Sequence, residues 1–153
     1  MNFKIIAAGL VGVCLTLLFS FATSFAETNS ADDDFDSEHR LIIQINTDDP
    51  RTQDIALSNI VNLQKHYGID NIEIEVVAYG PGLHMLTSKS KVTQRITSLM
   101  QSDVVFTACG NTMDTIHEST GVRPEVIDGV ESVQTGLARI IELQEAGWSY
   151  VKP

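Results

Sequence analysis

The sequence predicts an α/β domain built on a mostly parallel sheet with helices on both faces. Two observations carry this prediction. Short runs of strand type recur along the chain, and stretches with apolar residues at helical spacing separate them. Most of the helical stretches are also bounded by residues typical of helix ends. No internal repeat and no second domain is visible in the sequence.

The first two strands and the helix between them have clear signals. LIIQIN (41–46) is a short apolar run of strand type, and Asp49 followed by Pro50 is typical of an N-cap and a first helical residue. Gly68 is placed to end this helix. The segment NIEIEVVAYG (71–80) alternates and then becomes fully apolar, which predicts a strand buried at one end.

The second half of the chain continues the alternation. A helix is predicted around 92–100, with Ser88 or Ser90 near its start, and DVVFTAC (103–109) predicts a third strand. The remaining elements are expected as a short helix over about 112–118, a fourth strand within 125–133 despite Gly129, a helix over 137–144 ended by Gly147, and a strand at 148–151.

The first 26 residues have the pattern of a cleavable signal peptide. Lys4 gives a short positive region, residues 5–22 are uncharged and mostly apolar, and the small residues Ser24 and Ala26 stand at −3 and −1 of a cleavage site. An uncleaved membrane anchor is the alternative, because the apolar run is almost long enough to span a bilayer. We expect cleavage after Ala26 and a periplasmic location without stable membrane insertion.

The mature chain expected from this cleavage is strongly acidic. All 20 acidic residues lie at or beyond Glu27, and Lys4 is the only one of the 10 basic residues that is lost, so the net charge is −11. This charge repels nucleic acid and anionic lipid, and no nucleic-acid partner is expected. Much of it lies in residues 27–39, which predict a disordered acidic linker before a domain over 40–153.

One cysteine, Cys109, remains after cleavage. A single cysteine cannot form an internal disulfide, so in an oxidising compartment it is buried and inert, joined to another chain, or kept for its reactivity. It ends the third predicted strand, directly before a glycine and a helix start, where amide dipoles stabilise a thiolate and lower its pKa. This placement favours a reactive thiol, with a buried structural cysteine as the alternative.

The residues after Cys109 support this interpretation. Gly110 allows close approach to the sulfur, and Asn111 or Thr112 can cap the helix or donate a hydrogen bond. The histidines form no HxxxH pattern and the chain has no CxxC, GK[ST] or GxGxxG motif, so neither a metal site nor a cofactor is expected.

A second candidate segment follows the second predicted strand, since sites of open parallel sheets form at the carboxyl ends of strands. Gly80, Pro81 and Gly82 form a tight turn there, and His84 is placed to face Cys109 across the neighbouring strand ends. An ordinary strand-to-helix turn explains this segment equally well.

Together, the segments QINTDDP, EIEVVAYGPGLHML, FTACGNTM and GLARIIELQEAGWSYVKP resemble the exported branch of the DsrE/DsrF-like family, over about residues 40–153. The resemblance implies a three-layer α/β/α domain with a five-stranded sheet that assembles into homo-oligomers, as trimers or hexamers. It also implies that Cys109 carries sulfur as a persulfide and that residues 80–82 form the loop beside it.

These observations favour a periplasmic sulfur-binding or sulfur-transfer protein with Cys109 as carrier and a sulfur donor or acceptor protein as partner. The alternative is a non-catalytic oligomeric module that binds a small ligand and in which Cys109 is structural, so the sequence leaves open whether the chain is an enzyme. A thiol-redox enzyme fits less well without a resolving cysteine. Leu57 and Val61, beside Ile60, fit either an intersubunit contact or a wide core-facing stripe.

Overall fold

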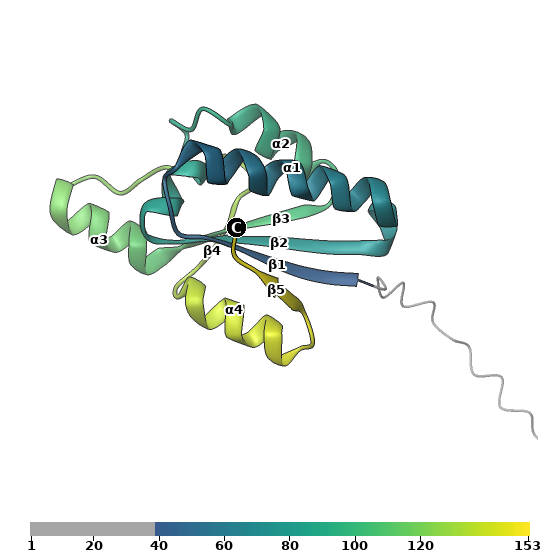
Figure 1. Ribbon diagram of the computed structural model, residues 1–153. Helices are drawn as coiled ribbons and strands as arrows, with labels where there is room; N and C mark the ends of the chain where they lie inside the picture. Colours follow the sequence, from purple (N-terminus) through teal and green to yellow (C-terminus); the bar gives the residue numbers. More distant parts are fainter. Residues whose placement is uncertain (1–38) are drawn as a thin grey trace, which may run out of the picture. The chain divides into compact units, whose positions relative to one another are not determined.

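The computed structural model describes residues 39–153, which form a five-stranded sheet in the order β4-β3-β2-β1-β5 (Figure 1). Neighbouring strands of this sheet all pair in parallel. The strands are β1 (His39–Ile45), β2 (Ile72–Ala78), β3 (Val104–Cys109), β4 (Glu131–Val133) and β5 (Ser149–Val151). The prediction of an α/β fold with a parallel five-stranded sheet is confirmed.

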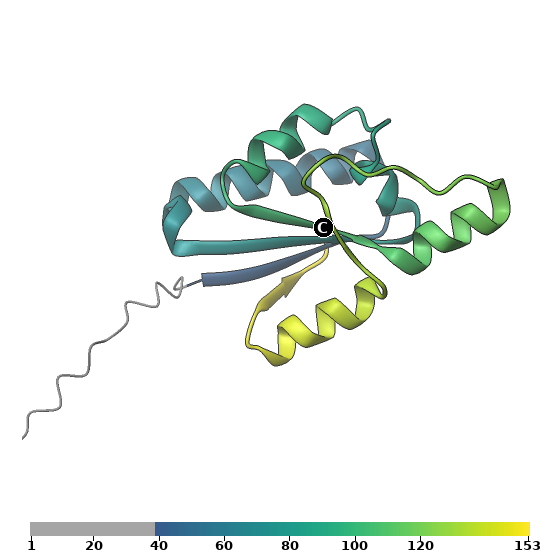
Figure 2. The same ribbon diagram turned by 180° about the vertical axis from the view of Figure 1, so that it is seen from behind.

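The helices lie on both faces of the sheet. Figures 1 and 2 show α1 (Pro50–Tyr67) and α2 (Thr93–Met100) over one face and α4 (Gly136–Glu145) over the other. The helix α3 (Gly110–Thr120) extends beyond the carboxyl end of β3, and only two of its residues, Gly110 and Met113, are buried. Two 3₁₀ helices, η1 (Ile69–Asn71) and η2 (Gly80–Leu86), flank β2.

The predicted signal peptide and residues 27–38 of the predicted linker lie outside the described residues. His39, which was expected to end that linker, is instead the first residue of β1 and pairs in register with Ile72 of β2. No helix within residues 39–153 is long and apolar enough to cross a membrane.

The first helix matches its prediction at both ends. The carboxylate of Asp49 accepts a hydrogen bond from the backbone N–H of Thr52 over 2.9 Å, and Gly68, at φ 92°, ends the helix. Leu57 is fully buried in the main core and Val61 packs against it. These two residues therefore belong to a wide core-facing stripe, and the intersubunit contact considered for them finds no support here.

Other element bounds differ from the prediction for local reasons. Asp103 has φ 60° and lies outside β3, which starts at Val104. The helix α3 begins directly after Cys109, two residues earlier than expected. Gly129 has φ 89° and lies outside β4, which covers only the last three residues of the predicted segment 125–133. The helix α2 starts at Thr93, and Ser90 accepts a hydrogen bond from the Val92 N–H just before it.

Two apolar clusters hold the helices on the sheet. The larger one lies between the sheet and α1 and α2, and Phe106 is its largest fully buried side chain. The smaller one lies beneath α4 and consists of Ile42, Val77, Ile140 and Leu143. Because the second cluster is small, α4 depends more than α1 does on polar contacts for its position.

Candidate functional site

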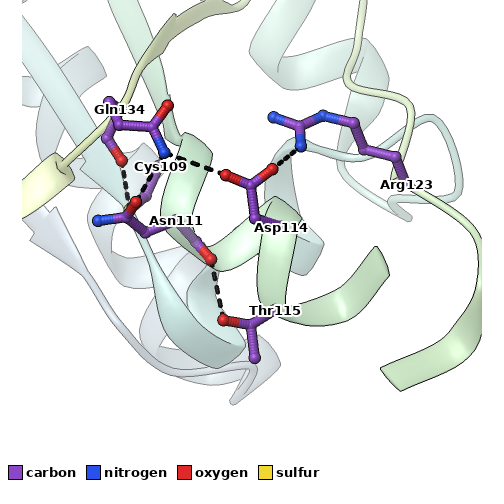
Figure 3. A network of polar contacts seen from close by, with 6 residues as sticks. All are labelled: Cys109, Asn111, Asp114, Thr115, Arg123 and Gln134. Atoms are coloured by element: carbon purple, nitrogen blue, oxygen red, sulfur yellow. Dashed lines mark hydrogen bonds and ion pairs between the residues drawn. The ribbon is translucent and has the colours of Figure 1, made fainter. Parts of the chain in front are cut away.

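Cys109 is the last residue of β3, as the sequence predicts. It is also the N-cap residue of α3, so Asn111 and Thr112, which the sequence offered as caps of this helix, lie inside its first turn instead. Cys109 is the one cysteine of residues 39–153, and only 5% of its surface is exposed. Its neighbours in space come from two segments, the first turn of α3 and the connection between β4 and α4 (Figure 3).

The amino ends of two helices meet at the sulfur of Cys109. The backbone N–H of Gly136, the first residue of α4, donates to Sγ over 3.3 Å. In the first turn of α3, the backbone N–H groups of Asn111 and Thr112 and the Thr112 side chain also favour the charged form of the thiol. In the neutral form the thiol donates weakly to the Gln134 carbonyl, with the sulfur 3.8 Å from that oxygen.

These contacts determine the acidity of the thiol. Burial is the largest single influence and raises the pKa of Cys109. The hydrogen bonds from Gly136, Thr112 and Asn111 stabilise the thiolate and together outweigh burial, so the pKa lies below that of an ordinary thiol. The arrangement favours an anionic sulfur in a nearly buried position.

Two glycines allow this close packing. A Cβ on Gly136 would lie 3.2 Å from the Cβ of Cys109 and 3.3 Å from Cγ1 of Val77. A Cβ on Gly110 would lie 3.2 Å from the Cα of Gln134. The close approach at Gly110 is to the backbone of the β4–α4 connection, whereas the sequence led us to expect an approach to the sulfur.

A polar network ties the β4–α4 connection to α3 (Figure 3). The side-chain N–H of Gln134 donates to Asn111 Oδ1 over 2.7 Å and to Asp114 Oδ2 over 3.0 Å. The backbone N–H of Asn111 donates to the Gln134 carbonyl over 2.9 Å, and its side chain donates to the Thr135 hydroxyl over 3.1 Å. Arg123 pairs with the other oxygen of Asp114.

Hydrogen bonds of this network also lower the pKa of the Asp114 carboxyl. The hydrogen bond from Gln134 is the largest cause, and the guanidinium of Arg123 adds to it. Sequence reasoning missed Gln134, Arg123 and Gly136, because each lies far along the chain from Cys109.

The glycine loop, residues 80–82, contacts the surroundings of Cys109 through a hydrogen bond to Thr112. It forms the 3₁₀ helix η2 rather than a simple turn, and the Gly80 N–H donates to the Thr112 hydroxyl oxygen over 2.9 Å. A Cβ on Gly82 would lie 2.2 Å from the carbonyl oxygen of Ile45, so this glycine packs against β1. Pro81 and His84 are exposed.

The structure thus brings together only part of the predicted set. Gly110, Asn111, Thr112 and, through Thr112, Gly80 surround Cys109. The expectation that His84 faces Cys109 finds no support, because the hydrogen-bonding partners of the sulfur do not include it. In η2 the side chains of Leu83 and Met85 are buried, whereas His84 between them is exposed.

A cavity of about 270 Å³ lies at the amino ends of β1 and β2, lined in part by Leu63, Tyr67 and Gly147, and Cys109 is not among its residues. Within residues 39–153, no group of three or more His, Cys, Asp or Glu side chains is placed to hold a metal ion.

Comparison with known proteins identifies the family. Residues 39–153 match the DsrE/DsrF-like family. The chain belongs to this family. This DsrE/DsrF-like chain is also similar to the solved structure of a protein of unknown function, MTH1491 from Methanobacterium thermoautotrophicum, with 30% identity and a TM-score of 0.68. That match covers 75% of this chain and 99% of the other.

Two further solved structures share the fold of this DsrE/DsrF-like chain. The ychN protein from E. coli has a TM-score of 0.60 at 15% identity, covering 76% of this chain and 99% of that protein. The conserved protein of unknown function BT1422 from Bacteroides thetaiotaomicron has a TM-score of 0.53 at 17% identity, covering 74% and 94%. No curated protein matches the chain.

Proposed function

We propose that this DsrE/DsrF-like protein binds or transfers sulfur in the periplasm and carries it as a persulfide on Cys109. The supporting observation is that the Gly136 N–H, at the amino end of α4, donates to the sulfur of Cys109, which is itself the N-cap residue of α3. Such donors stabilise negative charge on sulfur. They favour the thiolate that attacks a sulfur donor.

The transfer that this site supports involves no net oxidation. The Cys109 thiolate attacks the outer sulfur of a donor persulfide, R–S–SH, so that a new S–S bond forms at Cys109 while the S–S bond of the donor breaks. The donor leaves as the thiolate R–S⁻, and the outer sulfur keeps its hydrogen. The same step in reverse, with an acceptor thiolate as nucleophile, unloads Cys109.

The position of the thiol is compatible with exchange of this kind. Cys109 is nearly buried, yet its contacts Gln134 and Asn111 are exposed, as is Thr135 beside them. The β4–α4 connection and the first turn of α3 therefore lie between Cys109 and solvent on this side. The side chains that must move are held by hydrogen bonds rather than by apolar packing.

Mass spectrometry tests the proposal directly. Protein purified from its own periplasm should carry the mass of one added sulfur atom, or a trisulfide, on the peptide that contains Cys109. Reduced protein should take up the same mass from a small persulfide donor, and Cys109→Ser should not. A folded protein that takes up no sulfur under these conditions contradicts the proposal and leaves a structural cysteine, whereas a mixed disulfide indicates thiol-redox chemistry.

The export part of the proposal rests on the sequence alone and has its own test. N-terminal sequencing of the periplasmic protein should begin at Glu27. An intact Met1 on protein free of membranes would rule out the cleavage.

The proposed assembly into trimers or hexamers is tested by sedimentation of the same preparation. We expect a mass several times that of one chain at micromolar concentrations. A monomer under these conditions contradicts the proposed assembly.

A further inference from the structure

An ion pair between a buried carboxylate and a partly exposed guanidinium lies near Cys109, between α4 and the sheet. Glu75 on β2 is 2% exposed. The guanidinium of Arg139 on α4 donates to both of its carboxylate oxygens, from Nε over 3.0 and 3.2 Å and from Nη2 over 2.8 Å. The fully buried hydroxyl of Thr107 on β3 donates to Oε1 over 2.7 Å. Glu75 is therefore held by two elements other than its own.

This cluster shares its face of the sheet with the thiol. Thr107 and Cys109 are two residues apart in β3, so their side chains point to the same face. Gly136 and Arg139 are three residues apart in α4 and lie on the same side of that helix. The helix is thus fastened to the sheet at two successive points, first Gly136 on Cys109 and then Arg139 on Glu75.

The apolar contacts of α4 leave its position along the sheet weakly determined. Its buried apolar residues are Ile140 and Leu143, whereas Leu137 and Ile141 are about half exposed. A buried carboxylate without partners is costly, so Glu75 disfavours any placement of α4 that withdraws the Arg139 fork from it. Fixing the register between elements is the best-attested role of buried hydrogen-bonded charge.

We propose that Arg139, held by Glu75, whose carboxylate also accepts the Thr107 hydroxyl, is a positioning residue that sets the amino end of α4 so that the Gly136 N–H meets the sulfur of Cys109. This inference deepens the proposed function and rests on it, since Cys109 is the working residue in both. In this inference the ion pair of Arg139 and Glu75 affects the acidity of the Cys109 thiol as well as the stability of the fold.

Other charged groups lie near this assembly. Glu131 of β4 and Glu142 of α4 act on the guanidinium from outside the pair. Asp114 of α3 is bound by Arg123 and Gln134 on the opposite side of the thiol. A variant that keeps the positive charge at residue 139 therefore separates geometry from charge.

Arg139→Lys and Arg139→Met are the decisive variants. Lysine keeps the charge but has no planar fork that reaches both carboxylate oxygens, and methionine removes the charge at similar length. We expect both to raise the pH midpoint of Cys109 alkylation, so that labelling at pH 7 slows by about threefold to tenfold. Hydrogen exchange at the Gly136 amide should become faster in both variants.

Arg95→Met is the matched control. Arg95 pairs with Asp54 over 3.0 Å between α2 and α1, on the opposite face of the sheet. Its loss should leave the labelling midpoint and the Gly136 amide unchanged.

A folded Arg139→Met protein with the wild-type midpoint and wild-type exchange at Gly136 overturns the inference, whatever its melting temperature. If that variant does not fold, Arg139→Lys decides by the same criterion. A wild-type protein that takes up no persulfide sulfur removes the proposed function but leaves any dependence of the thiol midpoint on Arg139 in place. The two failures are therefore distinguishable.

Discussion

The backbone N–H of Gly136 donates a hydrogen bond to the sulfur of Cys109 over 3.3 Å, although the two residues are 27 positions apart in the chain. The helix α4, which starts after β4, thereby brings its amino end to the sulfur beside the amino end of α3, whose N-cap residue is Cys109. Dipoles of two helices then act on one sulfur, where the sequence alone places one.

Gly136→Ala tests this contact. The added Cβ would lie 3.2 Å from the Cβ of Cys109 and 3.3 Å from Cγ1 of Val77, so these side chains or the start of α4 have to give by a few tenths of an ångström. We expect a loss of about 1–3 kcal/mol in the free energy of unfolding, typical of overpacking, and a higher pKa of the thiol. Urea unfolding and the pH dependence of iodoacetamide labelling measure the two effects.

Gly121→Ala is the control for that variant. Gly121 ends α3 at φ 75° with open space around its Cα, so alanine strains the backbone there without reaching Cys109. Its labelling midpoint should equal that of the wild type even where its stability falls. An unchanged midpoint in Gly136→Ala would mean that the Gly136 N–H does not tune the thiol.

The lowered pKa of Cys109 also makes the stability depend on pH. Because the pKa is lower in the folded chain than in the unfolded one, ionisation favours the folded state. This contribution is fully present above the ordinary thiol pKa of about 8.5 and is lost as the pH falls through the lower folded value. Urea unfolding of wild type and Cys109→Ser should therefore diverge in favour of the wild type from neutral pH to about pH 9. A difference that stays constant over this range contradicts the lowered pKa.

The sequence was sufficient for the fold because the strand and helix signals are local. Asp49, Pro50 and Gly68 mark the first helix by their own chemistry, and Cys109 falls at a strand end by position alone. Gly110, Asn111 and Thr112 follow Cys109 directly, so their place around the sulfur could be inferred.

The rest of the site depends on contacts that no local pattern encodes. The approach of Gln134 and Gly136 depends on how β4 pairs with β3, and β4 has only three residues. Glu75 looks like the exposed half of an alternating strand in sequence, whereas α4 covers it in the structure. His84 was misplaced because the glycine segment forms a 3₁₀ helix instead of a short turn.

Thr112→Val tests the link between the glycine loop and the thiol. The Thr112 hydroxyl accepts the Gly80 N–H, and the Thr112 side chain is one of the groups that lower the pKa of Cys109, so valine removes both effects at nearly constant shape. We expect a higher labelling midpoint and a loss of about 1–3 kcal/mol in the free energy of unfolding, since the part-buried Gly80 N–H loses its partner. Thr112→Ser keeps the hydroxyl and should restore the midpoint. A valine variant with the wild-type midpoint would show that this hydroxyl does not act on the thiol.

Asp114 is expected to contribute to stability only above the acid range. The Gln134 amide and the Arg123 guanidinium lower the pKa of its carboxyl, so the folded value lies below the unfolded value of about 3.9. The contribution is fully present above that unfolded value and disappears as the pH falls through the folded one. Wild type should therefore be more stable than Asp114→Asn at pH 7, with an advantage that shrinks below about pH 4 and also in high salt, because the ion pair is half exposed. Glu118→Gln, an exposed change on the same helix, should show no comparable loss at pH 7. Thermal unfolding across this pH range measures the difference, and an advantage of wild type that persists undiminished in acid would show that the ionised carboxylate is not what holds Gln134.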